Sequence, residues 1–105
     1  MNRINMDEAK VLLDCKHLVT HLKEINEATR KMREEPDESL LAFYLQVFNS
    51  LEVLKDSCIE SAINVSERAN WWNKKVAHNL IKDITHHFFH VEQNLNTLQT
   101  NINKS

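Results

Sequence analysis

The sequence contains no glycine and only one proline, Pro36, among its 105 residues. Hairpins and tight strand connections need residues that accept a positive φ, which glycine supplies most easily. Dinucleotide-binding turns and P-loops need glycine as well, because the backbone must approach the phosphate closely. These absences exclude both nucleotide-binding classes and indicate a chain built from helices with short connections.

Long apolar runs, an excess of one charge and a large set of cysteines are also absent. No stretch approaches about 18 apolar residues, so we expect no membrane span, and we see no export signal after the N-terminus. A net charge of −2 argues against a protein whose main task is to coat nucleic acid. Two cysteines are too few for a disulfide scaffold, so we expect a cytoplasmic protein with reduced thiols.

Apolar residues recur at three- and four-residue steps, which predicts an all-α protein with one domain over residues 1–105. We expect an antiparallel bundle of three long helices over about 5–33, 36–63 and 66–101, with dimerisation into a larger bundle left open. The first apolar seam comprises Val11, Cys15, Leu18, Leu22, Ile25 and Met32. The second comprises Leu40, Tyr44, Val47, Leu51, Leu54 and Cys58. Further apolar residues surround the second helix, which predicts that it is the central, most buried element.

The first helix boundary has a clear signal and the second has a weak one. Asn5 is a candidate cap for the first helix, and Pro36 is suited to the first position of the second helix. We place the next turn near residues 63–66, with Ser66 as N-cap and Glu67 in the first turn. The alternative is one unbroken helix from residue 36 to about residue 100.

A basic segment with two adjacent tryptophans follows the acidic middle of the chain. Residues 36–65 contain five acidic and one basic residue, whereas residues 66–82 contain four basic and one acidic residue. We expect Trp72 in the apolar seam near Cys58 and Trp71 at the surface, although both could close the end of the core. The candidate partner-binding residues are Arg68, Trp71, Trp72, Lys74 and Lys75. An exposed tryptophan with a basic rim is typical of a contact with an acidic partner.

Six histidines raise the alternative of a divalent transition metal. Two pairs, His17 with His21 and His86 with His90, have the i, i+4 spacing that places both imidazoles on one helical face. The candidate ligands are His17, His21, Glu52 and His78 in one group, and Asp83, His86 and His90 in another. The helical period places these histidines at the edge of the seams, which favours surface or boundary positions. A pH-sensitive contact is the remaining interpretation.

Antiparallel pairing of the first two helices brings Cys15 within one turn of Cys58. We expect buried, unreactive thiols, with a disulfide between these helices as the alternative. The third helix is predicted to extend past its neighbours, which would leave Leu95, Leu98 and Ile102 for self-association. The alternative is a frayed tail past residue 101.

These patterns favour a non-catalytic module that binds another, unidentified protein and forms a homodimer. No cofactor is expected. The alternatives are a metal-binding bundle and a nucleic-acid contact through residues 66–82, which the near-neutral charge makes the weaker expectation.

Overall fold

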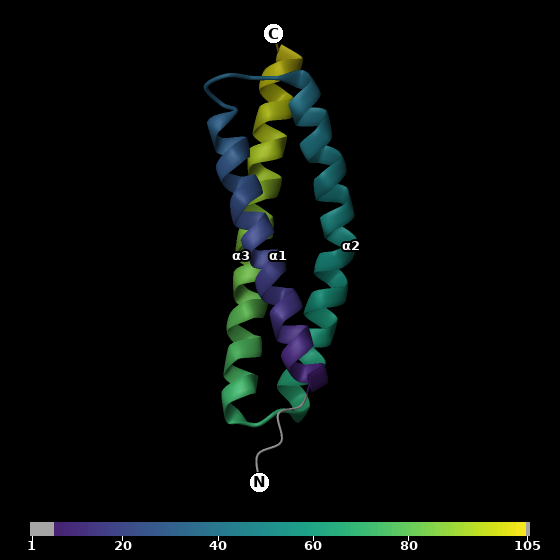
Figure 1. Cartoon of the computed structure of the whole chain (residues 1–105). Coiled ribbons are helices and arrows are strands. Elements are labelled where there is room, and N and C mark those ends of the chain that lie inside the picture. Colours follow the sequence, from purple (N-terminus) through teal and green to yellow (C-terminus); the bar gives the residue numbers. More distant parts are fainter. Residues whose placement is uncertain (1–5, 105) are drawn as a thin grey trace.

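The structure, a computed structural model, describes residues 6–104 and contains three helices. They are α1 (Met6–Lys31), α2 (Glu38–Arg68) and α3 (Trp71–Lys104). α1 and α3 run parallel to each other and α2 runs antiparallel to both, in a rod of 62 × 18 × 16 Å (Figure 1). The predicted all-α three-helix bundle is confirmed, and residues 6–104 contain no strand. Asn5, the predicted cap of the first helix, lies outside the described residues.

The connection between α1 and α2 is close to its predicted position. α1 ends with Arg30 and Lys31 in its last turn, where cations interact favourably with the helix dipole. Asp37 is the N-cap of α2, because its Oδ1 accepts a hydrogen bond from the Leu40 N–H at 3.0 Å. Pro36 therefore precedes the cap and is not the first helical residue.

The second connection differs from the prediction. Ser66 is buried inside α2, and its hydroxyl donates to the Ile63 carbonyl at 2.7 Å. The helix continues to Arg68, and the turn consists of Ala69 and Asn70. The Asn70 Oδ1 accepts from the Asn73 N–H at 3.0 Å and caps α3. The predicted boundary at residues 63–66 is therefore wrong, because a serine hydroxyl can also bond to the preceding turn of its own helix. The alternative of one unbroken helix is wrong as well, since α2 ends at Arg68.

The later turn also changes the position of the end of α3. Leu95 and Leu98 are each only 1% exposed within a single chain. Ile102 is half-buried and borders a small hollow together with Leu41 and Leu45 of α2. The end of α3 thus lies beside the start of α2 and does not extend past it. Leu95 and Leu98 are therefore not available for the predicted self-association, because the bundle itself covers them. Ile102 remains partly exposed.

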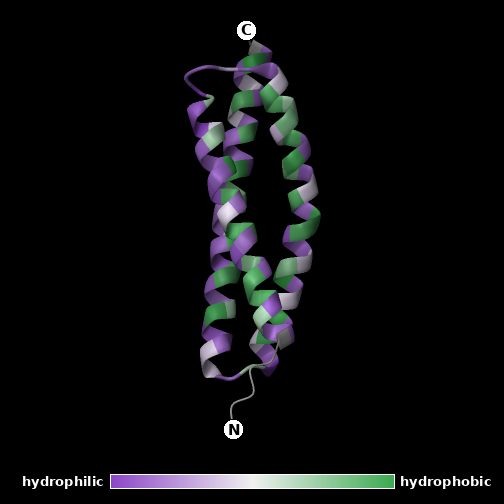
Figure 2. Ribbon diagram, in the orientation of Figure 1, coloured by the Kyte–Doolittle hydropathy of each residue, from purple (hydrophilic) through white to green (hydrophobic). Residues whose placement is uncertain are grey.

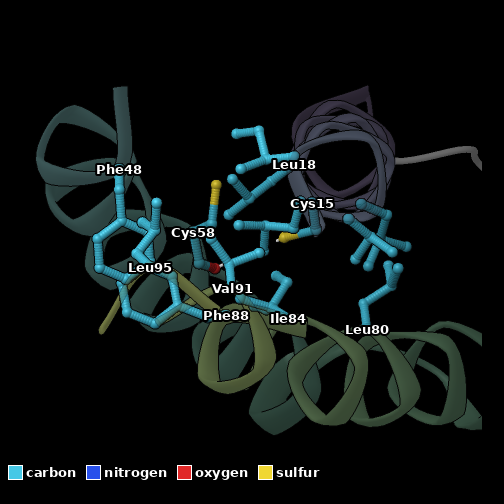
Figure 3. Packing of buried hydrophobic residues seen from close by; sticks show 14 of the residues in the cluster. Cys15, Leu18, Phe48, Cys58, Leu80, Ile84, Phe88, Val91 and Leu95 are labelled. Atoms are coloured by element: carbon cyan, nitrogen blue, oxygen red, sulfur yellow. Dashed lines mark hydrogen bonds between the residues drawn. The ribbon is translucent and has the colours of Figure 1, made fainter. Parts of the chain in front are cut away.

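The core runs along the axis between the three helices. Phe48 of α2 stacks on Phe88 of α3, with ring centroids 4.4 Å apart (Figure 3). The Lys55 Nζ lies 4.3 Å from the Phe88 centroid, on the same α2–α3 contact. The side chains that are less than 2% exposed include Leu18, Leu22, Val65, Ile84, Val91, Leu95 and Leu98. This packing fixes how α2 is rotated about its own axis.

That rotation leaves α2 more exposed than predicted. Leu41 and Phe48 are buried, whereas Leu40 and Leu54 from the predicted seam are 42% and 46% exposed. α2 also exposes Phe43, Val53 and Ile63, so it is not the most buried element. Hydrophobic residues recur along its whole length (Figure 2). Because α2 is apolar around much of its circumference, the sequence pattern did not decide which side faces inward.

A buried polar cluster joins the parallel helices α1 and α3. The Asn94 side chain donates to the Asn26 Oδ1 at 2.6 Å and to the Thr29 Oγ1 at 3.3 Å. The Asn94 Oδ1 accepts from the Arg33 guanidinium at 2.8 Å. Asn94 is only 8% exposed, so its amide needs these partners. The cluster therefore favours a single register between α1 and α3.

We expect Asn94→Ala to lower the free energy of unfolding by about 1–3 kcal/mol, because the substitution leaves partly buried polar groups of α1 without a partner. Urea unfolding followed by circular dichroism measures this loss. Asn96→Ala is the matched control, since Asn96 is exposed on the same helix, and it should change stability by less than about 0.5 kcal/mol. Equal effects of the two substitutions would contradict the role of the cluster.

Candidate functional site

The basic–tryptophan patch lies at the turn between α2 and α3. We define it as Arg68, Trp71, Trp72, Lys74 and Lys75, the five residues singled out from the sequence. Trp71 is 70% exposed and Trp72 is 63% exposed, and their ring centroids lie 6.1 Å apart. The Lys75 Nζ lies 5.6 Å from the Trp71 centroid, within cation–π range. The structure therefore places Trp72 and Lys75 beside Trp71 at the surface, with Lys74 lining the same hollow as Trp71. Arg68 is exposed at the end of α2.

Trp72 was expected in the core, and this is wrong. α3 begins at Trp71, so both tryptophans lie in its first turn. Ala77 is the first residue of α3 to be fully buried. The shifted turn thus moves Trp72 out of the packed part of the bundle. The interpretation that both indoles close the end of the core is wrong for the same reason.

The patch continues along the outer side of α3. A surface hollow of about 500 Å³ is lined by Trp71, Lys74, Lys75, His78, Asn79 and Lys82. These residues follow one another at helical spacing, on the side of α3 opposite the buried Ala77, Leu80 and Ile84. Sequence reasoning missed Asn79 and Lys82 as members of this surface. Lys75 and Lys82 are seven residues apart, a spacing that places them on one side of a helix. To assign this side to the surface, the residue at which α3 begins had to be known.

Positive charge at this end of α3 is not compensated by nearby acidic residues of the helix. The first turn of α3 contains no acidic residue. The N-terminus of a helix carries a partial positive charge, so Lys74 and Lys75 add to it and do not balance it. A patch of this kind attracts an anionic group electrostatically and offers two flat indole rings for packing.

The structure does not assemble the predicted metal ligands. His17 and His21 are exposed on α1, and His78 is exposed on the outer side of α3. Glu52 is exposed on α2 and borders a hollow that also contains Phe89 and Glu92 of α3. Among the described side chains, no three His, Cys, Asp or Glu residues lie together as a metal site requires. The expected convergence of His17, His21, Glu52 and His78 is therefore wrong.

The second histidine group forms a close ring cluster on α3. The His86 and His90 ring centroids are 4.4 Å apart, and those of His86 and His87 are 5.2 Å apart. His87 is half-buried, and its burial lowers the pKa of the imidazole below its ordinary value. His86, Lys23 of α1 and His90 lower this pKa further, while Asp83 opposes them. The cluster therefore disfavours protonation of His87 in the folded chain.

Cys15 and Cys58 are buried free thiols, as predicted. The Cys15 thiol donates to the Cys58 carbonyl at 3.6 Å, which confirms the expected proximity of the two residues (Figure 3). Burial and the neighbouring Cys58 raise the pKa of Cys15 to about 12, and burial also raises the pKa of Cys58. Cys15 and Cys58 form no disulfide between α1 and α2 in this structure, contrary to the alternative interpretation. Neither thiol has the thiolate character of a nucleophile.

Comparison with protein-family models, with curated protein sequences and with solved structures finds no match to this chain. Within the described helices, none is long and apolar enough to cross a membrane.

We expect the folded protein to lose stability as the pH falls through about 6.5, the ordinary pKa of histidine. The unfolded chain binds a proton at His87 more readily than the folded chain does, so acid favours unfolding until the pH passes below the folded pKa. His87→Gln should reduce this loss in urea titrations between pH 7.5 and pH 5. His17→Gln, at an exposed position on α1, is the control. An unchanged pH dependence in His87→Gln would contradict the assignment.

We expect both thiols of the native protein to resist a disulfide reagent such as Ellman's reagent at pH 8. The raised pKa of Cys15 and the burial of both residues keep the reactive thiolate form scarce. Two thiols should react promptly once urea has unfolded the chain. Rapid modification of the native protein, with its helical circular dichroism intact, would contradict this.

Proposed function

We propose that the chain is a non-catalytic interaction module that binds an acidic segment of another protein through the basic–tryptophan patch. The observation that carries the proposal is the pair of adjacent tryptophans, 70% and 63% exposed, beside lysines on the outer side of α3. Tryptophan and arginine are enriched among the residues that dominate binding energy in protein interfaces. Carboxylates of a partner would meet Arg68, Lys74 and Lys75, and its apolar side chains would pack on the indoles.

The energetic cost of the patch supports a binding role. Cations near a helix N-terminus are unfavourable, and Lys74 and Lys75 lie just after the first turn of α3, with no acidic residue in that turn to balance them. Large indoles on the surface expose apolar area to water at a further cost. Neither feature helps the bundle to fold, since Ala77 and the residues beyond it form the core. A bound partner offsets both costs.

A protein partner fits the charge distribution better than nucleic acid does. The whole chain has a net charge of −2, and α2 presents exposed acidic residues such as Asp56, Glu60 and Glu67. A long polyanion would be repelled by this neighbouring acidic surface, whereas a short acidic segment need only contact the patch. We place the protein in a reducing compartment such as the cytoplasm, where Cys15 and Cys58 remain thiols.

We expect Trp71→Ala to weaken the binding of a suitable acidic peptide by about 10- to 30-fold, the range typical of a tryptophan hot spot. The probes are fluorescein-labelled peptides rich in Asp and Glu with interspersed Leu and Phe, tested by fluorescence anisotropy against basic and neutral peptides of equal length. Lys74→Ala combined with Lys75→Ala should weaken binding by a similar factor. Because these side chains are exposed, the melting temperature should stay nearly unchanged.

Lys31→Ala is the matched control, since Lys31 is an exposed cation at the opposite end of the rod. It should leave the affinity unchanged. A large loss of stability in Trp71→Ala would assign this indole to the core. Tighter binding to a single-stranded oligonucleotide, falling steeply with salt, would favour the nucleic-acid alternative. No preference for acidic peptides in the panel would contradict the proposed recognition.

A further inference from the structure

Two rows of opposite charge run along neighbouring helices of the bundle. The acidic row consists of exposed residues of α2 at steps of four and seven: Glu52, Asp56, Glu60 and Glu67. The basic row consists of exposed residues of α3 at steps of four: Lys74, His78 and Lys82. These steps keep the members of each row on one side of their helix. The molecule therefore presents negative charge along α2 and positive charge along α3.

A hollow between α2 and α3 places the two rows on one face of the rod, which we call the α2–α3 face. The hollow has a volume of about 330 Å³, and its lining residues are Glu52, Lys55 and Ile59 of α2 with Thr85, Phe88, Phe89 and Glu92 of α3. Glu52 belongs to the acidic row, and Thr85 lies one turn after Lys82 of the basic row. Phe89 is 53% exposed, so the face also offers apolar area between its charged rows.

The two rows lie at the same height along the rod. α2 and α3 run antiparallel from the turn at residues 69–70, so residues equally far from this turn lie at the same level. Asp56 is 13 residues before the turn and Lys82 is 12 residues after it. Glu60 is nine residues before the turn and His78 is eight residues after it. The acidic and basic rows therefore match each other level by level.

Within one chain the two rows do not pair with each other. Among the ion pairs of residues 6–104, none joins the acidic row to the basic row. Asp56 pairs with its neighbour Lys55 at 3.2 Å. Lys74, His78 and Lys82 line the open hollow on the outer side of α3. The charges of both rows are therefore exposed to a partner.

We propose that a second copy of this chain docks on the α2–α3 face, about a two-fold axis parallel to the rod. Such an axis, placed along the groove between the two helices, sets α3 of each copy opposite α2 of the other at the same level. Each basic row then meets an acidic row, twice over. Neighbouring helices across the contact run antiparallel, as in an up-down-up-down four-helix bundle. The opposed pairs are Lys82 with Asp56, His78 with Glu60, and Lys74 with Glu67.

The presence of both signs on one face selects a second copy over other partners. Nucleic acid, or an acidic segment long enough to cover the face, would be repelled by the acidic row. Another protein would have to present both signs in the matching order, whereas a second copy does so by symmetry. The contact goes beyond the function proposed above. It covers Lys74, but Trp72 and Lys75 lie on the next side of α3 and stay open to an acidic partner.

The test is sedimentation equilibrium of the full chain between about 5 and 500 µM, a range suited to a weak interface. We expect a monomer–dimer equilibrium. Lys82→Glu and Asp56→Lys should each raise the dissociation constant by at least about 10-fold, because each places like charges opposite one another twice. Lys31→Glu is the matched control, since Lys31 is exposed on α1, outside the face. All three variants should keep the wild-type helical circular dichroism.

Mixing the two variants tests the pairing itself. An equimolar mixture of Lys82→Glu and Asp56→Lys chains should dimerise as the wild type does, because one of the two contacts is then reversed in sign and the other is native. Raising sodium chloride should weaken the wild-type dimer, since salt screens exposed charges.

A chain that stays monomeric at every concentration would overturn the proposal, as would a mixture that fails to recover or a dimer that ignores salt. Binding of the acidic peptides by a strictly monomeric chain would overturn the dimer alone and leave the proposed function standing.

Discussion

The position of the turn between α2 and α3 is the constraint on which the rest of the structure depends. Two antiparallel helices joined by two residues have a register that is fixed by where the first one ends. α2 continues through the buried Ser66 to Arg68, and Asn70 caps α3. Each residue of α3 therefore lies opposite a later part of α2 than a turn near residue 65 would give. Leu95 and Leu98 enter the core, while Trp71 and Trp72 remain outside it.

The rotation of α2 is the second constraint, and it depends on contacts with α3. Apolar residues surround much of α2, so several of its sides satisfy a simple burial pattern. The stack of Phe48 on Phe88, together with Lys55 above the same ring, selects one of them. Leu40 and Leu54 then lie at the surface, and Leu54 lines the groove next to α1. The exposed apolar residues of α2 are thus a consequence of core packing and not of an unusual local sequence.

The sequence was sufficient for the fold class and for the first apolar seam, because spacing and the absence of glycine are local signals. Pro36 marked the first turn for the same reason, since its ring restricts the residue before it. The second turn has no such marker. Ser66 and Asn70 are both good N-caps, and only tertiary packing distinguishes them. For the candidate site, the charge of residues 66–82 and the two indoles were visible in advance, but the exposure of Trp72 and the inclusion of Lys82 depended on the correct start of α3.

The patch on α3 and the exposed apolar residues of α2 make different demands on a partner. The patch offers cations and indoles, and it suits a ligand of opposite charge. Phe43, Val53 and Leu54 of α2 offer apolar area with no charge among them. Both surfaces follow from the position of one turn and the rotation of one helix, because the late end of α2 leaves the indoles outside the core and the stack of Phe48 on Phe88 turns other apolar residues of α2 outward.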